Sequence, residues 1–191
     1  MIQAHLTRRC SWCGDDPQYV DYHDTEWGIP VRDDRHLFEL ICLEGQQAGL
    51  SWITVLKKRA HYRKVFKNFE IVPVSRMTDA TIEKLLSDTG LIRHRLKLYS
   101  IRNNAIAALA LQAEFGSLEN YFWGFVGGVP IDGKKLSMTD VPASTELSGA
   151  LSKDLKKRGF KFIGSTICYA FMQAGGLIND HVQDCFRYEQ M

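Results

Sequence analysis

Cysteine and histidine residues, the most frequent zinc ligands in proteins, lie close to both ends of the chain. Cys10, Cys13 and His23 lie near the start, and His181 and Cys185 lie near the end. If His181 and Cys185 are on a helix, their four-residue spacing places both side chains on one face. Four Cys and His ligands would make a closed, structural zinc site that ties the two ends together. The alternative is that His181 and Cys185 are only a polar helix pair and Cys10 an incidental thiol.

A glutamate stands in an unusual place in the first third of the chain. Glu44 directly follows the apolar face of a predicted helix, and a glycine-containing turn after it presents Leu50 and Trp52. A buried carboxylate is costly unless it has partners. Glu44 therefore either caps a helix or forms a local salt bridge, or it lines a pocket.

Aromatic residues crowd the same part of the chain. Aromatic faces bind flat or cationic ligands by stacking and cation–π attraction, although most such clusters belong to a hydrophobic core. Both interpretations stay open for this cluster, which consists of Trp12, Tyr19, Tyr22, Trp27 and Trp52.

A glycine turn separates two predicted helices in the middle of the chain. Gly90 follows the first helix, and the basic residues Arg93 and Arg95 open the second. Backbone N–H groups at such a helix start can hold a phosphate. Any helical hairpin shows a similar pattern, however, so the spacing alone does not identify a DNA contact.

Length and composition are those of an ordinary globular protein. The chain has 191 residues, of which 45% are hydrophobic and 24% charged, enough for one domain or two closely packed lobes. The net charge of +2 does not indicate a nucleic-acid-binding protein, so a DNA-binding surface would need local clusters of cations. Three basic clusters are either such surfaces or solvated helix faces: Lys57-Lys58-Arg59, Arg93-His94-Arg95 with Lys97, and Lys156-Lys157-Arg158 with Lys161.

The sequence also predicts where the protein is found. It has no apolar stretch of about 18 residues, so no membrane-spanning helix is expected. The first ten residues lack the pattern of a signal peptide, which predicts a cytoplasmic protein. Five cysteines without an export signal favour reduced thiols or metal ligands over disulfides.

Hydrophobic periodicity predicts an all-α fold with almost no strand. Capping residues and glycines mark the helix ends. The first expected helix begins at Asp33 or Asp34, the second spans 51–69, the third opens at Thr78 or Asp79, and a long fourth helix follows Gly90. A short helix spans 120–126, and a loop follows at 127–142. The last two helices carry Leu147, Leu151 and Leu155 up to Gly159 and span Ser165 to Ala174.

Taken together and in this order, these features resemble the 3-methyladenine DNA glycosylase I family of the helix-hairpin-helix superfamily. The resemblance runs through nearly the whole chain. Its most specific segments are Tyr22-His23-Asp24-Thr25-Glu26-Trp27-Gly28, Cys42-Leu43-Glu44-Gly45-Gln46-Gln47-Ala48-Gly49-Leu50-Ser51-Trp52, Lys157-Arg158-Gly159-Phe160-Lys161-Phe162 and Asn179-Asp180-His181-Val182.

The resemblance implies a helix-hairpin-helix glycosylase fold in a single unit, 1–191, of two helical lobes, with the hairpin at about 79–110. It implies one structural zinc ion held by Cys10, His23, His181 and Cys185. The base-binding residues that it implies are Tyr19, Tyr22, Trp27, Glu44 and Trp52, with Glu44 as the catalytic residue. The DNA contacts that it implies are Gly49, Leu50, Gly90, Arg93 and Lys161.

The function implied is base-excision repair. The protein would flip a nucleotide out of double-stranded DNA and hydrolyse its N-glycosidic bond to release 3-methyladenine, without lyase activity and as a monomer. Leu50 would fill the gap left in the base stack. Two other functions are considered: a zinc-stabilised helical DNA-binding module without catalysis, and a zinc hydrolase. A hydrolase needs an open coordination position on the metal, which four Cys and His ligands do not leave.

Overall fold

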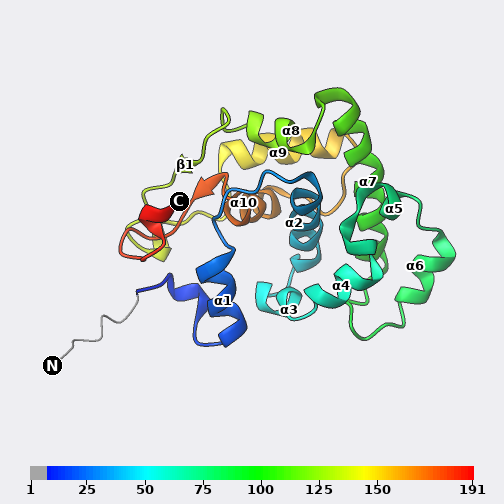
Figure 1. Ribbon diagram of the computed structural model, residues 1–191, viewed down its shortest axis with the longest axis horizontal. Helices are drawn as coiled ribbons and strands as arrows, with labels where there is room; N and C mark the ends of the chain where they lie inside the picture. The colour runs from blue at the N-terminus through cyan, green and yellow to red at the C-terminus, as the bar shows by residue number, and fades with distance from the viewer. Residues whose placement is uncertain (1–7) are drawn as a thin grey trace.

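The computed structural model describes residues 8–191, and this part of the chain is mostly helical (Figure 1). Two short strands, β1 (Ile131–Asp132) and β2 (Ile178–Asn179), pair in parallel. Short 3-10 helices span Ser11–Cys13, Lys67–Phe69, Met138–Asp140 and Tyr188–Gln190. The α-helices are α1 (Pro17–Thr25), α2 (Asp34–Gln47), α3 (Trp52–Leu56), α4 (Arg59–Val65), α5 (Ile71–Ser75), α6 (Asp79–Leu85), α7 (Arg95–Phe115), α8 (Leu118–Gly124), α9 (Glu146–Lys157) and α10 (Ser165–Ala174).

Helix α2 lies at the centre of the fold. It packs against α10, α7, α8 and α3, while α9 covers α10 and α5 and α6 pack on α7 (Figure 1). The apolar residues of α2 that the sequence assigned to the core, among them Leu37, Phe38 and Ile41, are fully buried. The buried apolar residues form one continuous cluster that extends from Cys10 to Cys185. The two lobes and the hairpin expected at 79–110 stay predictions, with α6 and α7 as the helices on either side of its turn.

Several helix ends lie where capping chemistry predicts them. Asp33 caps α2 by accepting a hydrogen bond from His36 N, and Thr78 caps α6 by accepting one from Thr81 N. Helix α9 ends in its basic last turn just before Gly159, which has a φ of 95°. Helix α10 spans the predicted residues.

The long helix predicted over 51–69 is wrong. The chain there forms α3 and α4, which are separated at Lys57 and Lys58, followed by a 3-10 turn. Lys67, Asn68 and Phe69 in that turn all have positive φ, which a right-handed helix does not allow. The breaks let the chain turn so that Tyr62, Phe66 and Phe69 are all fully buried. Their spacing resembles one helical face, but tertiary packing determines the path of the chain.

Helix α1 was not identified from the sequence. Asp16 caps it by accepting hydrogen bonds from Gln18 N and Tyr19 N, and Pro17 occupies its first turn. The helical placement considered for His181 and Cys185 is also wrong, because both residues lie in turns after β2.

The two ends of the described chain meet on one side of the molecule (Figure 1). The pairing of Ile131 with Ile178 fixes the 127–142 connection against the C-terminal segment. Phe186 N donates to Arg8 O, which joins the C-terminal segment to the N-terminal one. No helix formed by residues 8–191 is long and apolar enough to cross a membrane. Most of the segment on which the signal-peptide prediction rests, residues 1–7, lies outside the described residues.

Candidate functional site

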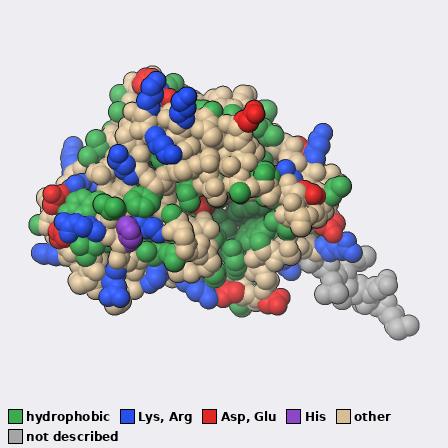
Figure 2. All heavy atoms as spheres, turned by 180° about the vertical axis from the view of Figure 1, so that it is seen from behind, with side chains coloured by type: hydrophobic (Ala, Val, Ile, Leu, Met, Phe, Trp, Pro, Cys, Tyr) green, Lys and Arg blue, Asp and Glu red, His purple; other side chains and the backbone are tan. Residues whose placement is uncertain are grey.

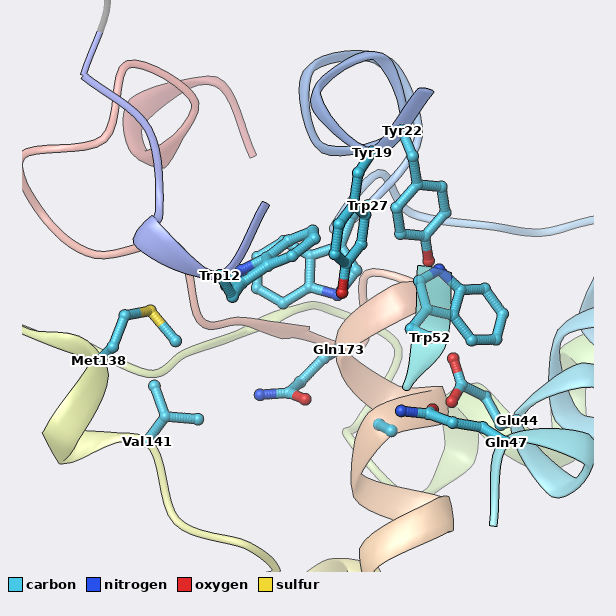
Figure 3. A pocket seen from close by; sticks show the side chains of 11 residues that line it. Trp12, Tyr19, Tyr22, Trp27, Glu44, Gln47, Trp52, Met138, Val141 and Gln173 are labelled. Atoms are coloured by element: carbon cyan, nitrogen blue, oxygen red, sulfur yellow. The ribbon is translucent and has the colours of Figure 1, made fainter. Parts of the chain in front are cut away.

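A cavity of about 230 Å³ brings together aromatic residues and one carboxylate (Figure 3). All five residues predicted to bind the base line it. Figure 2 shows the face turned away from the viewer of Figure 1, where apolar side chains line a hollow and Lys and Arg side chains are spread around it. The cavity is lined by Trp12, Tyr19, Tyr22, Trp27, Glu44, Gln47, Trp52, Met138, Val141, Ala170 and Gln173.

Short elements hold the aromatic rings around this cavity. Tyr19 and Tyr22 lie three residues apart on α1 and therefore share a face of that helix. Trp12 lies in the 3-10 helix before α1, with its ring centroid 5.0 Å from those of both Tyr19 and Trp27. Trp52 opens α3, and its ring lies 5.6 Å from that of Tyr22. The aromatic cluster is thus both part of the core and the wall of a cavity.

Glu44 enters the cavity from α2 and has no partner there. Its residue surface is 3% exposed, and its Oε2 atom makes no hydrogen bond within residues 8–191. Burial raises the pKa of Glu44 to about 8. The structure therefore does not support the interpretation of Glu44 as a helix cap or a salt-bridge residue.

Hydrogen-bond donors in the cavity are also unsatisfied. The indole Nε1 atoms of Trp12 and Trp52 are buried without a partner in residues 8–191. Burial raises the pKa of Tyr19 to about 12, so its hydroxyl group stays a donor at neutral pH. A buried carboxylate and buried indole donors without partners are unfavourable in an empty cavity. A ligand with complementary polar edges would satisfy them.

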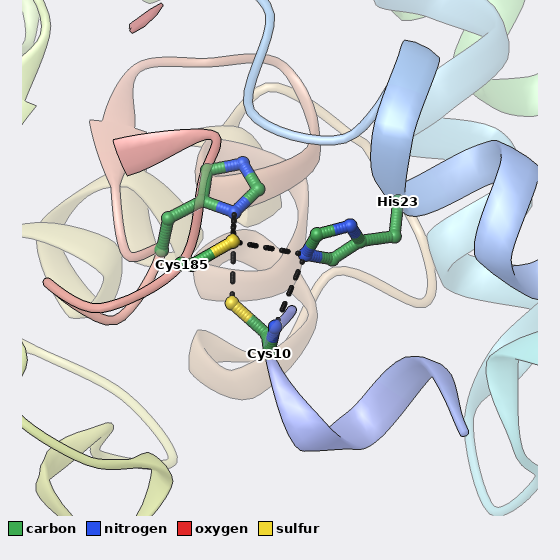
Figure 4. Close-up of side chains that lie close together, drawn as sticks. Cys10, His23 and Cys185 are labelled. Carbon is green, nitrogen blue, oxygen red and sulfur yellow. Dashed lines mark hydrogen bonds between the residues drawn. The ribbon is translucent and has the colours of Figure 1, made fainter. Parts of the chain in front are cut away.

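Next to this cavity, two cysteines and two histidines form a buried cluster (Figure 4). One ligand atom from each of Cys10, His23, His181 and Cys185 lies within 4.8 Å of all the others, so the cluster could hold a metal ion. The Sγ atoms of Cys10 and Cys185 both lie 3.5 Å from Nδ1 of His181. Cys185 Sγ also lies 3.5 Å from Nε2 of His23. Cys13 is not in the cluster, because its thiol donates to Cys10 O.

The remaining nitrogen atoms of the two imidazole rings have partners of their own. His23 Nδ1 lies 2.7 Å from Oδ1 of Asp24, and Arg9 holds the same carboxylate with three hydrogen bonds. His181 Nε2 lies 3.2 Å from Trp27 O. These contacts orient His23 Nε2 and His181 Nδ1 toward the two sulfur atoms.

The cluster and the cavity share a wall. The ring centroid of Trp27 lies 4.6 Å from that of His181, and the centroid of Trp12 lies 5.3 Å from that of His23. Displacing the histidines would therefore displace two aromatic residues of the cavity.

The residues predicted to contact DNA lie in three connections between helices. Gly49 and Leu50 lie in the turn after α2, where the Leu50 side chain is exposed. Gly90 lies between α6 and α7 against the ring of His61, and a Cβ at Gly90 would come within 2.5 Å of that ring. Arg93 and Lys161 are exposed.

These three connections approach one another. The segments carrying Arg93 and Lys161 are neighbours, because the rings of the next residues, His94 and Phe162, lie 5.9 Å apart. The carbonyl group of Phe162 lies against Gly45 of α2, where a Cβ would come within 3.1 Å of its oxygen.

The three basic clusters are less available than the sequence suggests. Arg59 forms two hydrogen bonds to the Glu26 carboxylate, and Arg158 pairs with Glu114 and Asp154. Lys97 is 5% exposed, so its assignment to a surface cluster is wrong. Ion pairing therefore offsets part of the positive charge of these clusters, and burial withdraws Lys97 from the surface.

Six cavity residues were not among the predicted base-binding residues. Gln47 lies three residues after Glu44 on α2, and this spacing could have identified it. Trp12 belongs to the aromatic cluster in the sequence. No local signal marks the other four, because the chain returns to the cavity only through tertiary folding: Met138, Val141, Ala170 and Gln173.

Comparisons with known proteins agree on one family. Residues 12–188 match the family model described as methyladenine glycosylase. DNA-3-methyladenine glycosylase 1 of Escherichia coli (strain K12) is 52% identical over 180 residues, covering 94% of this chain and 96% of the relative. DNA-3-methyladenine glycosylase of Haemophilus influenzae is also 52% identical over 180 residues, covering 94% and 97%.

Solved structures give the same result. A crystal structure of 3-methyladenine DNA glycosylase I superposes with a TM-score of 0.92 at 54% identity, covering 94% of this chain and 98% of that one. The Staphylococcus aureus 3-methyladenine DNA glycosylase I, in a structure that describes 3-methyladenine recognition, gives a TM-score of 0.91 at 38% identity, covering 94% and 96%.

Proposed function

We propose that this chain, which belongs to the methyladenine glycosylase family, acts in base-excision repair by hydrolysing the N-glycosidic bond of 3-methyladenine in DNA. The observation that carries this proposal beyond family membership is the Glu44 carboxylate, which is buried among aromatic rings and has no partner in residues 8–191.

The alkylated base carries a positive charge and an amino edge, which complement the aromatic faces and the carboxylate of this cavity. Methylation at N3 gives adenine a positive charge and weakens its glycosidic bond, so the base leaves with little acid catalysis. The faces of Trp52 and Tyr22 attract a flat, electron-poor ring. The Glu44 carboxylate accepts hydrogen bonds from the amino edge of the base.

The ionisation of Glu44 depends on what fills the cavity. With a pKa of about 8, Glu44 is mostly protonated in the empty cavity at neutral pH. A cationic base favours the ionised carboxylate, so binding shifts the pKa back down and releases a proton. The negative charge then also stabilises the positive charge that develops on the sugar as the bond breaks.

The base must leave the duplex before it can reach this cavity. A flipped nucleotide leaves a gap in the base stack, and the exposed Leu50 side chain is the wedge that fills it. The backbone around Gly90 and the side chains of Arg93 and Lys161 contact phosphates and hold the duplex in register. Damaged base pairs cost less to open, which contributes to selection of the substrate.

The same cavity explains why release of the base is the only reaction. A lyase step needs an amine that forms a Schiff base with the sugar. None of the cavity-lining side chains among the described residues carries an amine. The product is therefore an intact strand with an abasic site, together with free 3-methyladenine.

The metal ion that fits the Cys and His cluster is zinc. Zinc bonds of about 2.3 Å to sulfur and about 2.0–2.1 Å to nitrogen place tetrahedral S and N ligands about 3.6 Å apart. The sulfur–nitrogen distances of 3.5 Å in the cluster agree with this geometry. Cys10, His23, His181 and Cys185 would hold the ion through four ligand atoms, so it would supply stability and no chemistry at the base.

An assay of base release decides between this function and DNA binding without catalysis. Duplex DNA treated with a methylating agent is incubated with the protein, and the released bases are separated by chromatography. We expect 3-methyladenine to appear, and the DNA strand to break only after alkali. Tight binding of the duplex without release of base would identify a non-catalytic DNA-binding module. The monomeric state and the cytoplasmic location expected from the sequence stay predictions.

A further inference from the structure

Lys97, near the start of α7, is a buried cation between the proposed DNA contacts and the centre of the fold. Its ammonium group donates to two backbone carbonyl oxygens near the end of α2, Gln46 O at 2.8 Å and Ala48 O at 2.6 Å. The last carbonyl groups of a helix have no partners within the helix, and a cation also interacts favourably with that end of the helix dipole. Lys97 therefore fixes the chain where α2 becomes the turn that carries Leu50.

A chain of buried hydrogen bonds connects the same point to the hairpin turn. Gln46 is fully buried, and its Nε2 atom donates to Lys97 O at 3.0 Å. The hydroxyl group of Tyr62 donates to Gln46 Oε1 at 3.2 Å and accepts from Ile92 N at 3.1 Å. Ile92 lies in the segment between α6 and α7, next to Arg93. The turn after α2 and the hairpin turn are therefore joined through the side chains of Lys97, Gln46 and Tyr62.

This joint lies outside the cavity. Lys97, Gln46 and Tyr62 are all buried, but none of them lines the cavity in the part of the chain that the structure describes. A change in the joint can therefore alter the position of Leu50 without altering the aromatic walls.

We propose that Lys97 is a positioning residue that holds the 47–51 turn in a fixed place relative to the 86–94 hairpin turn, so that binding of phosphate at the hairpin and insertion of Leu50 into the base stack occur as one event. The inference rests on the proposed function, because it needs Leu50 to be the wedge. Rigid coupling is useful because a preformed wedge loses less conformational entropy when the DNA binds.

The test is a double-mutant cycle between Lys97→Met and Leu50→Ala, measured on a duplex with an abasic site. Lys97→Met keeps most of the side-chain volume but removes the charge and its donors. We expect it to lower affinity for the abasic duplex about tenfold, within the range of coupling between residues that share a hydrogen-bond network. In the Lys97→Met background, Leu50→Ala should have little further effect, because a wedge that is already misplaced contributes little.

Three further measurements separate positioning from damage to the fold. Free 3-methyladenine should bind Lys97→Met as tightly as the unmodified protein. Lys64→Met, at an exposed position on α4, should leave both affinities unchanged. Tyr62→Phe removes only the hydroxyl group that bridges Ile92 and Gln46. In this background, too, Leu50→Ala should have little further effect on affinity for the abasic duplex, a result that can be measured even if Lys97→Met folds poorly.

The outcomes are distinct. Additive losses in the double variants, or equal losses for the abasic duplex and the free base, would overturn the inference and leave the proposed function intact. If Leu50→Ala alone has no effect on abasic-duplex binding, the assignment of Leu50 as the wedge is wrong and the inference is wrong with it. Release of 3-methyladenine by the unmodified protein tests the catalytic function separately.

Discussion

Two glutamates of α2 show how differently the fold treats a buried carboxylate. Glu39 is 1% exposed and forms ion pairs with Arg63 at 2.7 Å and Arg35 at 3.4 Å. Glu44, little more than one turn later, is 3% exposed and has no ion pair or hydrogen bond at Oε2 in residues 8–191. Two arginines compensate the charge of Glu39, whereas the charge of Glu44 has no such partner and is costly to the fold in the absence of a ligand.

The first prediction concerns catalysis by Glu44. Glu44→Gln keeps the size of the side chain but removes its charge and replaces one acceptor with a donor. Excision of 3-methyladenine should fall about 10²-fold or more, the effect of removing one preorganised electrostatic contact. In the unmodified enzyme kcat/KM should rise with pH up to about 8, because it reports the ionisation of the free enzyme, and this rise should be absent in Glu44→Gln. Single-turnover release of base over a pH series measures both effects, and an unchanged rate in Glu44→Gln would refute the catalytic role.

The second prediction concerns stability and pH. Burial raises the pKa of Glu44 to about 8, whereas an exposed glutamate titrates near about 4.3. The folded state thus binds the proton more tightly than the unfolded state does. Protonation of Glu44 therefore stabilises the folded state. This stabilisation is full below about pH 4 and is lost as the pH rises toward 8, by up to about 1.4 kcal/mol per pH unit.

Urea unfolding from pH 5 to pH 9 measures this contribution as the difference between the unmodified protein and Glu44→Gln. Groups other than Glu44 cancel in that difference. We expect Glu44→Gln to become progressively the more stable of the two as the pH rises. A difference that does not change with pH would show that Glu44 is not desolvated in solution.

At the scale of secondary-structure elements, the turn after α2 carries the third prediction. Leu50→Ala should weaken binding to an abasic-site duplex and hardly change binding of free 3-methyladenine, because the proposed wedge would act on the base stack and Leu50 does not line the cavity. Val72 on α5 has the same exposed fraction as Leu50, 43%, and Val72→Ala should change neither affinity. Equal weakening of both ligands by Leu50→Ala would indicate general damage to the protein.

Local capping chemistry identified the starts of α2 and α6 and could also have identified α1, whereas the path of the chain between 51 and 69 depends on packing. Asp33 and Thr78 mark the starts of α2 and α6 because their side chains bond to free N–H groups, a local interaction. The breaks between 51 and 69 follow from the burial of Tyr62, Phe66 and Phe69 against distant elements, which no local pattern contains.

The residues of the candidate site also separate into those that the sequence could identify and those that it could not. The residues predicted for the cavity walls and the metal cluster come from segments whose identity the resemblance could supply, and the structure brings them together. Met138 and Gln173 reach the cavity from the 3-10 helix Met138–Asp140 and from α10, and Lys97 is buried although it lies in a run of cations. Each of these placements depends on contacts between residues far apart in the sequence.

At the scale of the whole molecule, the cluster of Cys10, His23, His181 and Cys185 joins the two ends of the described chain, and it carries the fourth prediction. His181→Ala or Cys185→Ala should lower the free energy of unfolding by several kcal/mol, because a structural zinc site contributes directly to folding. Base release below the lowered Tm should fall less than stability does, because the proposed ion does not touch the base and acts on the cavity only through Trp12 and Trp27, which pack against the histidines. Thermal unfolding and metal analysis measure the two properties.

Cys13→Ala is the matched control for the cluster. Cys13 is buried three residues from Cys10, but its thiol bonds to Cys10 O and is not a ligand atom. Its substitution should leave the zinc content at one ion per chain. Absence of zinc from protein purified without chelators would show that the cluster is held by hydrogen bonds alone.

The distance in sequence between the ligands also sets an order of events during synthesis. His181 follows Cys10 by 171 residues, and a chain is made from its N-terminal side onward. On the ribosome, Cys10 and His23 therefore lack their two C-terminal partners until His181 and Cys185 have emerged. Trp12 and Trp27 pack against His23 and His181. The nascent protein can therefore form its central helices early, but it completes the wall of its cavity only after His181 and Cys185 have been synthesised. A repair enzyme built in this way has no finished base-binding cavity while it is still being made.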